Sequence, residues 1–263
     1  MLAQNISVQV LGPVKETMIT LDLDLYRRGM KIQQSVQNKN WILLPGSLHI
    51  FFASLHALGK IVDGSGLVTC AVECGLFSSS SLSAVYSGKK YYRGVEYHLI
   101  TASALKMLKF DALSCDIDFH GASVLYQNFV KFLNNNCPRI NEAYINIEEW
   151  YQTNIKSREN ISHLEGLGRF LQAYLEQVNN LLLLISSCRS GNLELYLASV
   201  ENQVKYFVAT DLLNYARLMP IFLGQMASLE KEDPQSWKSL KEGDFVVKKS
   251  TVSFTALGID QAL

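Results

Sequence analysis

Two acidic residues near the N-terminus, Asp22 and Asp24, have the types and spacing best suited to chemistry. They fall in the segment TMITLDLDL (17–25), whose alternation of polar and apolar residues predicts a β-strand. Residues two apart on a strand point to the same side, so both carboxylates would face one position where Mg²⁺ or Mn²⁺ prefers oxygen ligands. An acidic pair is also common on a solvent-exposed strand face, and the spacing alone leaves that alternative open.

Histidines and cysteines give a weaker case for a metal site. His49 and His56 lie two turns apart on a predicted helix (47–62), too far apart to hold one ion without other ligands. The alternative is two helix-face histidines satisfied by their neighbours. Cys70 and Cys74 are one turn apart, and no second Cys/His pair follows at a zinc-site spacing.

The segment GKKYYRG (88–94) combines three cations with two tyrosines. The candidate contacts for a phosphate backbone are Lys89, Lys90 and Arg93, and the two tyrosine rings would stack on a base. The alternative is an exposed loop before a helix at 95–110, because short charge clusters are usually solvated surface.

Composition limits the classes of function. The 263 residues carry 24 basic and 24 acidic side chains, so the net charge is zero, which weighs against a dedicated nucleic-acid binder but permits a local patch. Residues 41–59 have no formal charge, yet Pro45 and Gly46 favour a buried helix over a membrane span. The N-terminus lacks a secretory signal, and five scattered cysteines indicate free thiols. We therefore expect an intracellular protein, nuclear or cytoplasmic, with no membrane partner.

Strand-like segments lie at both ends of the chain, with a helical block between them. The terminal segments need partners to bury one face, which favours a sheet with a helical insertion over two independent domains. We expect an α+β, predominantly α-helical fold, with an incomplete sheet-containing core (1–120 and 240–263) and a helical bundle insertion (121–239). The expected strands are 7–11, 17–25, 42–44, 245–248 and 252–255, and the expected helices are 26–36, 47–62, 67–76, 95–110, 122–133, 142–154, 162–187, 192–209 and 212–229.

Six long segments, taken together and in order, resemble a family of uncharacterised, transposon-derived proteins of invertebrate and fish genomes. They are TLDLDLYRRGMKI (20–32), LLPGSLHIFFASLHALGKIVDGSGL (43–67), SGKKYYRGVEYHL (87–99), SGNLELYLASVENQVKYFVATDLLNYARLMPIFLGQM (190–226), FVVKKS (245–250) and DQAL (260–263). The resemblance covers most of the chain and implies a transposase-like protein with a ribonuclease H-like core interrupted by helices.

In such cores, acidic residues hold two Mg²⁺ or Mn²⁺ ions about 3.5–4 Å apart, which activate water and stabilise the leaving oxygen. Asp22 matches the family's strand aspartate, and His49 matches its Gly-x-x-His position. Asp24 and Asp260 complete the catalytic candidates, and Asp22 and Asp24 are the expected metal ligands. Histidine is an unusual ligand for Mg²⁺, so His49 is expected to orient a group or handle a proton.

The sequence also departs from the family pattern. The family's last motif continues from Asp-Gln-Ala-Leu into a glutamate, whereas this sequence stops at Leu263, and strands that would precede Ser7 are missing. A metal-dependent nuclease or strand-transfer core that lacks part of its carboxylate set should be inactive. We therefore expect a truncated or domesticated remnant with DNA as its partner. The alternative is a helical protein–protein interaction module with no enzymatic activity.

Overall fold

The computed structural model describes residues 17–36, 40–78, 81, 84–85, 90–115, 166–248 and 254–255. The chain divides into two compact units, unit 1 (1–57 with 183–263) and unit 2 (58–182). The described elements are β1 (Thr17–Leu21), α2 (Leu23–Ser35), β2 (Trp41–Pro45), α3 (Ser47–Val62), α4 (Leu67–Glu73), α6 (Tyr91–Cys115), α9 (Leu167–Ser190), α10 (Leu193–Ala209), α11 (Leu213–Glu232), α12 (Pro234–Ser239), η3 (Leu240–Asp244), β3 (Val247–Lys248) and β4 (Phe254–Thr255).

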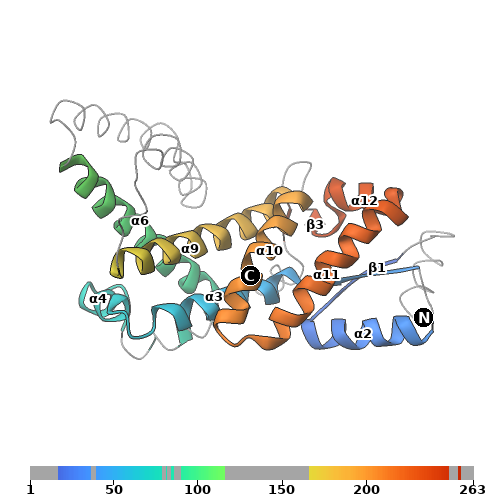
Figure 1. The fold of residues 1–263 in the computed structure, drawn as a ribbon, viewed down its shortest axis with the longest axis horizontal. Helices are drawn as coiled ribbons and strands as arrows, with labels where there is room; N and C mark the ends of the chain where they lie inside the picture. The colour runs from blue at the N-terminus through green and yellow to red at the C-terminus, as the bar shows by residue number, and fades with distance from the viewer. Residues whose placement is uncertain are drawn as a thin grey trace. The chain divides into compact units, whose positions relative to one another are not determined.

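These elements confirm a predominantly helical α+β fold (Figure 1). The ribonuclease H-like ancestry of the small sheet stays a prediction. Residues 183–239 fall in the same compact unit as the two parallel strands, and the division into a sheet-containing core and a helical insertion stays a prediction. The expected helices at 122–133 and 142–154 lie outside the described residues. No helix in the described ranges combines the length and apolarity needed to cross a membrane.

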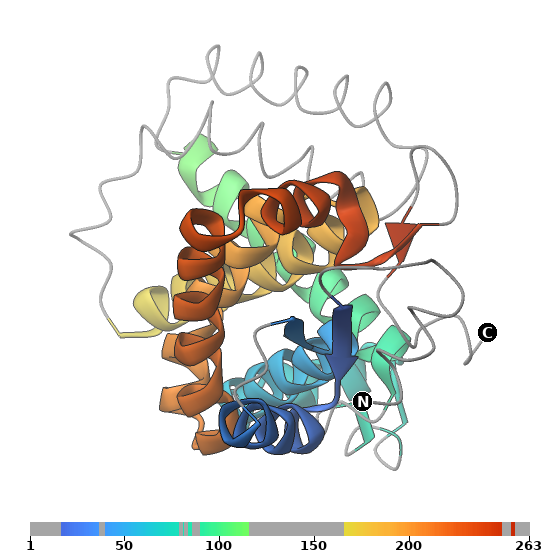
Figure 2. The same ribbon diagram turned by 90° about the vertical axis from the view of Figure 1, so that its right-hand side faces the viewer.

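Unit 1 is built on a parallel pair of strands. Leu21 of β1 lies opposite Pro45 of β2, and the pairing runs in register back to the start of both strands. Two neighbouring parallel strands need a crossover connection, and α2 supplies it between β1 and β2. Figure 2 shows the β1 arrow beside α2. A Cβ at Gly29 of α2 would approach Leu21 Cδ1 to 3.1 Å and Leu43 Cδ1 to 3.3 Å. Glycine therefore lets α2 pack closely against both strands.

The predicted strand at 17–25 is wrong beyond Leu21, because α2 begins at Leu23. The alternation of polar and apolar residues continues past the point where the helix starts, because Asp22 caps the first helical turn by accepting from a free backbone N–H group. The helix predicted to follow the Pro45-Gly46-Ser47 break and to end at Val62 is confirmed as α3, which includes Ser47 in its first turn. Its apolar face is buried, while His49 and Lys60 are exposed on the other face.

Helices α10 and α11 complete the core of unit 1. The ring of Tyr196 packs against Phe222 and Phe245, with centroid separations of 6.4 and 5.1 Å. Helix α12 begins at Pro234, and the carboxylate of Asp233 before it accepts the Ser236 N–H at 3.1 Å. Proline suits this first helical position because it lacks an N–H that would be left unpaired.

The two strands expected at 245–248 and 252–255 are present in shorter form and pair antiparallel as β3 and β4. Phe254 of β4 packs against two glycines with left-handed backbones, Gly191 (φ 66°) after α9 and Gly243 (φ 101°) in η3. A Cβ at Gly191 would lie 3.0 Å from the Phe254 ring, and one at Gly243 would overlap it. Both positions therefore require glycine for conformation and for space.

Unit 2 packs α4, α6 and the first part of α9 around aromatic side chains. Ala71, Phe77, Val85 and Tyr97 form one buried cluster, in which the rings of Phe77 and Tyr97 meet edge to face. His98 beside them is fully buried, and its Nδ1 lies 2.9 Å from the Tyr174 hydroxyl of α9. Burial lowers the pKa of His98 to about 3, because a charged imidazole would be poorly solvated there.

Replacing Gly243 tests the Phe254 packing. Gly243→Ala should lower the free energy of unfolding by about 2–4 kcal/mol, since alanine is strained at this φ and its methyl group displaces the ring. Gly224→Ala is the matched control, because nothing lies within 4 Å of a Cβ there and alanine stabilises helices by about 0.5–1 kcal/mol. Urea unfolding measures both variants, and a neutral Gly243→Ala would contradict the packing.

Acid should destabilise unit 2 through His98. The pKa of His98 in the folded protein, about 3, lies below the ordinary value of 6.5, so the unfolded state binds the proton first. The free energy of unfolding is therefore at its full value above pH 6.5 and falls as the pH drops toward 3. Between pH 8 and pH 5 the loss from this group is about 2 kcal/mol. Hydrogen exchange of α6 amides, compared between the wild type and His98→Leu, measures this loss of stability. The variant is needed because Lys106 is also buried, with its pKa lowered to about 7, and can make stability depend on pH as well. The same pH dependence in both proteins would refute the assignment to His98.

Candidate functional site

The candidate site lies at the carboxyl ends of the two parallel strands of unit 1. Asp22 follows the last residue of β1, and His49 lies in the first turn of α3, just after β2. The Gly46 N–H donates to the Leu21 carbonyl at 2.7 Å, which joins the two segments beyond the last strand pair. The carboxyl edge of parallel strands is where open α/β sheets usually bind ligands. The structure thus places two of the sequence-predicted residues just beyond two neighbouring strand ends.

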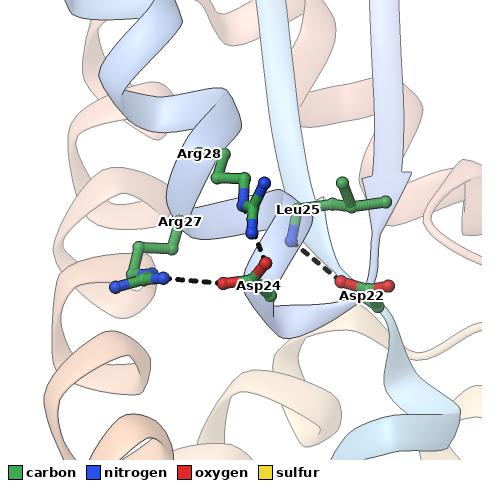
Figure 3. Close-up of polar contacts among 5 residues, drawn as sticks. All are labelled: Asp22, Asp24, Leu25, Arg27 and Arg28. Carbon is green, nitrogen blue, oxygen red and sulfur yellow. Dashed lines mark hydrogen bonds and ion pairs between the residues drawn. The ribbon is translucent and has the colours of Figure 1, made fainter.

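Asp22 caps α2. Its backbone is extended (φ −61°, ψ 167°), and its Oδ1 accepts the Leu25 N–H at 2.8 Å (Figure 3). An aspartate at this position satisfies one free helix donor and complements the positive end of the helix dipole. The side chain is exposed, so its other oxygen can still meet a solvent ligand. Asp22 therefore has a structural role whether or not it binds a metal.

Asp24 does not point with Asp22 from a common strand face, so this part of the prediction is corrected. It lies in the first turn of α2, and its two oxygens each contact one guanidinium at 2.7 Å, those of Arg27 and Arg28 (Figure 3). The hydrogen bond from Arg27 holds the pKa of Asp24 below its usual range, with Arg28 adding to the effect. The two arginines compete with any cation for this carboxylate, and its role as a second metal ligand stays a prediction.

The residues around His49 explain how α3 starts at this point. A Cβ at Gly46 would approach the Leu21 carbonyl oxygen to 3.3 Å, so a larger residue would crowd that backbone, and it would just touch His49 Cδ2 at 3.4 Å. Ser47 is buried, with its Oγ 3.4 Å from the Tyr196 hydroxyl. The imidazole of His49 is exposed and meets the Phe52 ring edge-on at 6.3 Å. Its exposure leaves it open to a solvent ligand.

Tyr215 of α11 is a site residue that the sequence reasoning missed. Its hydroxyl donates to the His49 carbonyl oxygen at 3.1 Å. Burial raises the pKa of Tyr215 to about 12, and the negative charge of Asp22 adds to the increase, so Asp22 lies within electrostatic range of the phenol. No local motif marks Tyr215, because it is 166 residues from His49 and its role comes only from the fold.

The remaining predicted site residues belong to unit 2 or lie outside the described residues. Lys90 and Arg93 belong to unit 2, at the start of α6, which begins at Tyr91 rather than at the expected residue 95. Lys90 is exposed, and the Arg93 guanidinium lies 6.0 Å from the centroid of the Phe77 ring. Lys89 and Asp260 lie outside the described residues.

The donor set at this edge suits at most a weakly held hard cation. Across the described ranges, no three His, Cys, Asp or Glu side chains gather closely enough to hold a metal ion. Mg²⁺ often binds through one or two carboxylates and keeps several waters, which a single exposed Asp22 can accommodate. An ion held this way would be anchored by Asp22, with water filling most of its coordination sphere.

Comparison with known proteins gives a family and no further relatives. No curated protein and no solved structure matches the chain. One family matches residues 4–263, and its description is "Domain of unknown function (DUF8702)". Because the match covers nearly the whole sequence, the chain belongs to the DUF8702 family.

Proposed function

We propose that this protein is a transposase-like remnant of a metal-dependent nuclease core, which holds a divalent cation weakly at Asp22 and does not cleave DNA. The observation that carries the proposal is the position of Asp22 and His49 at one edge, although 26 residues separate them in the sequence. The segments that resemble the transposase-like family include both residues. The carboxyl edge of parallel strands adds a position suited to ligand binding.

The lack of cleavage follows from the number of available carboxylates. Two-metal hydrolysis needs acids that hold both ions about 3.5–4 Å apart, on either side of the scissile phosphate. The acidic pair read from the sequence leaves one carboxylate available to a cation, that of Asp22, because Arg27 and Arg28 hold that of Asp24. One carboxylate binds one hydrated cation and cannot fix a second beside it.

Any DNA contact would be weak and electrostatic. The net charge of the whole chain is zero, and affinity for nucleic acid depends on local positive charge. Lys90 and Arg93, with Lys89, remain the proposed phosphate contacts. Because they belong to unit 2, this part of the proposal is independent of the Asp22 edge.

A helical interaction module is the second candidate, and one observation favours it. Leu25 and Ile32 of α2 and Val36 at its C-cap recur at helical spacing, and each is about half exposed, at 49%, 51% and 49%. An apolar stripe of this kind is typical of surfaces that bind another protein. This alternative expects a folded chain that is indifferent to metal.

Manganese titration separates the two candidates. Substoichiometric Mn²⁺ should broaden the NMR signal of the Leu25 amide, which donates to Asp22, and that of the His49 ring, which the proposal places at the same strand edge. The affinity should be on the order of millimolar. Asp22→Asn should abolish the broadening. Asparagine caps helices as well as aspartate does, so this change removes the charge and leaves the start of α2 intact.

Asp24→Asn is the matched control. It removes a neighbouring carboxylate whose exposed ion pairs contribute little to stability, and it should keep the broadening. Plasmid DNA incubated with the wild type and Mn²⁺ should show no more nicking than with EDTA. Nicking that Asp22→Asn removes would overturn the inactive assignment. No broadening in the wild type would overturn the cation site and leave the interaction module.

A further inference from the structure

We infer that Tyr215 is the positioning residue of the Asp22–His49 edge, fixing the first turn of α3 from α11. Its relevance to a bound cation rests on the proposed function, while its contact with His49 does not. The hydroxyl donates to the His49 carbonyl oxygen at 3.1 Å, so the tie acts on the backbone at the residue whose imidazole borders the edge. Holding that peptide limits where the exposed imidazole can move.

The phenol is itself held in place by packing. Its ring lies 5.2 Å from the ring of Phe207, and Phe207 is fully buried in α10. Aromatic pairs at such separations are stabilised beyond the area that they bury. Tyr215 is therefore supported on one side by the helix pair α10–α11 and contacts α3 on the other.

The direction of the hydrogen bond determines what the phenol can offer to a ligand. Its proton is donated to His49, so the oxygen is left with lone pairs for any third group. An oxygen acceptor within electrostatic range of the Asp22 carboxylate suits a hard cation, or a water molecule bound to one, and disfavours an anion. Tyr215 thus makes the site favour a cation over an anion.

Tyr26 provides a matched control. Its hydroxyl donates to Gln225 Oε1 at 2.6 Å, which ties α2 to α11 much as Tyr215 ties α11 to α3. Tyr26→Phe and Tyr215→Phe each remove one hydroxyl and keep the ring. General loosening of α11 should follow from either change, whereas an effect on His49 should follow only from Tyr215→Phe.

The experiment compares wild type, Tyr215→Phe and Tyr26→Phe without metal. In Tyr215→Phe, the ring signals of His49 should shift, and hydrogen exchange of the Ile50 and Phe51 amides should accelerate about three- to tenfold, as expected for loss of one hydrogen bond. Tyr26→Phe should leave both readouts unchanged. Unchanged His49 signals in Tyr215→Phe, or equal changes in both variants, would overturn the inference.

Adding Mn²⁺ to the same samples tests the link to the cation. Tyr215→Phe should weaken the broadening of the His49 ring at least threefold relative to that of the Leu25 amide. Equal broadening at both residues would refute a role for Tyr215 in the cation site. Absence of broadening in the wild type would instead refute the proposed function, and the metal-free comparison would still decide whether Tyr215 positions His49.

Discussion

The parallel pairing of β1 with β2 is the interaction on which the rest of unit 1 depends. Its register sets Leu21 opposite Pro45, and the added bond from the Gly46 N–H to the Leu21 carbonyl extends it by one step. The two strands therefore end level, which places Asp22 and the start of α3 at the same edge of the pair. Two strands alone are marginally stable in water, so the close packing of α2 through Gly29 is part of the same constraint.

Two neighbouring acids at the start of α2 show how local structure divides chemical roles. Both are favourable near the positive end of a helix. Asp22 uses one oxygen as a cap and keeps the other toward solvent, whereas Asp24 gives both oxygens to arginines on the next turn. Capping alone explains an aspartate at position 22 in structural terms. Its proximity to His49 and Tyr215 is what makes it a candidate for more than that.

The sequence predicted elements well where one signal dominated. For α3, Pro45-Gly46 before the helix and an apolar run through it agree, and the helix is confirmed with its end at Val62. Segment 17–25 combines strand alternation with a capping aspartate, and the cap prevails after Leu21 because it satisfies a backbone donor. Helix α6 begins at Tyr91, before the expected start at residue 95, because Gly94 and the basic residues before it suggested a loop.

The candidate site was predictable in part, for a physical reason. Asp22 and His49 each follow a strand, so their positions come from local sequence and from the rule that parallel strands end at one edge. Tyr215 comes from a helix more than 160 residues further on, and nothing near it in the sequence specifies the carbonyl that it contacts. Contacts such as that of Tyr215 with the His49 carbonyl depend on long-range packing, which the periodicity of apolar residues in the sequence does not specify.

The seating of Phe254 between Gly191 and Gly243 has a consequence for the order of assembly. The ring contacts the residue just after α9 and a bend inside η3, so its socket does not exist until both have formed. We therefore expect the β3–β4 pair to form late in the folding of unit 1, because α9 and η3 supply the surface that Phe254 contacts.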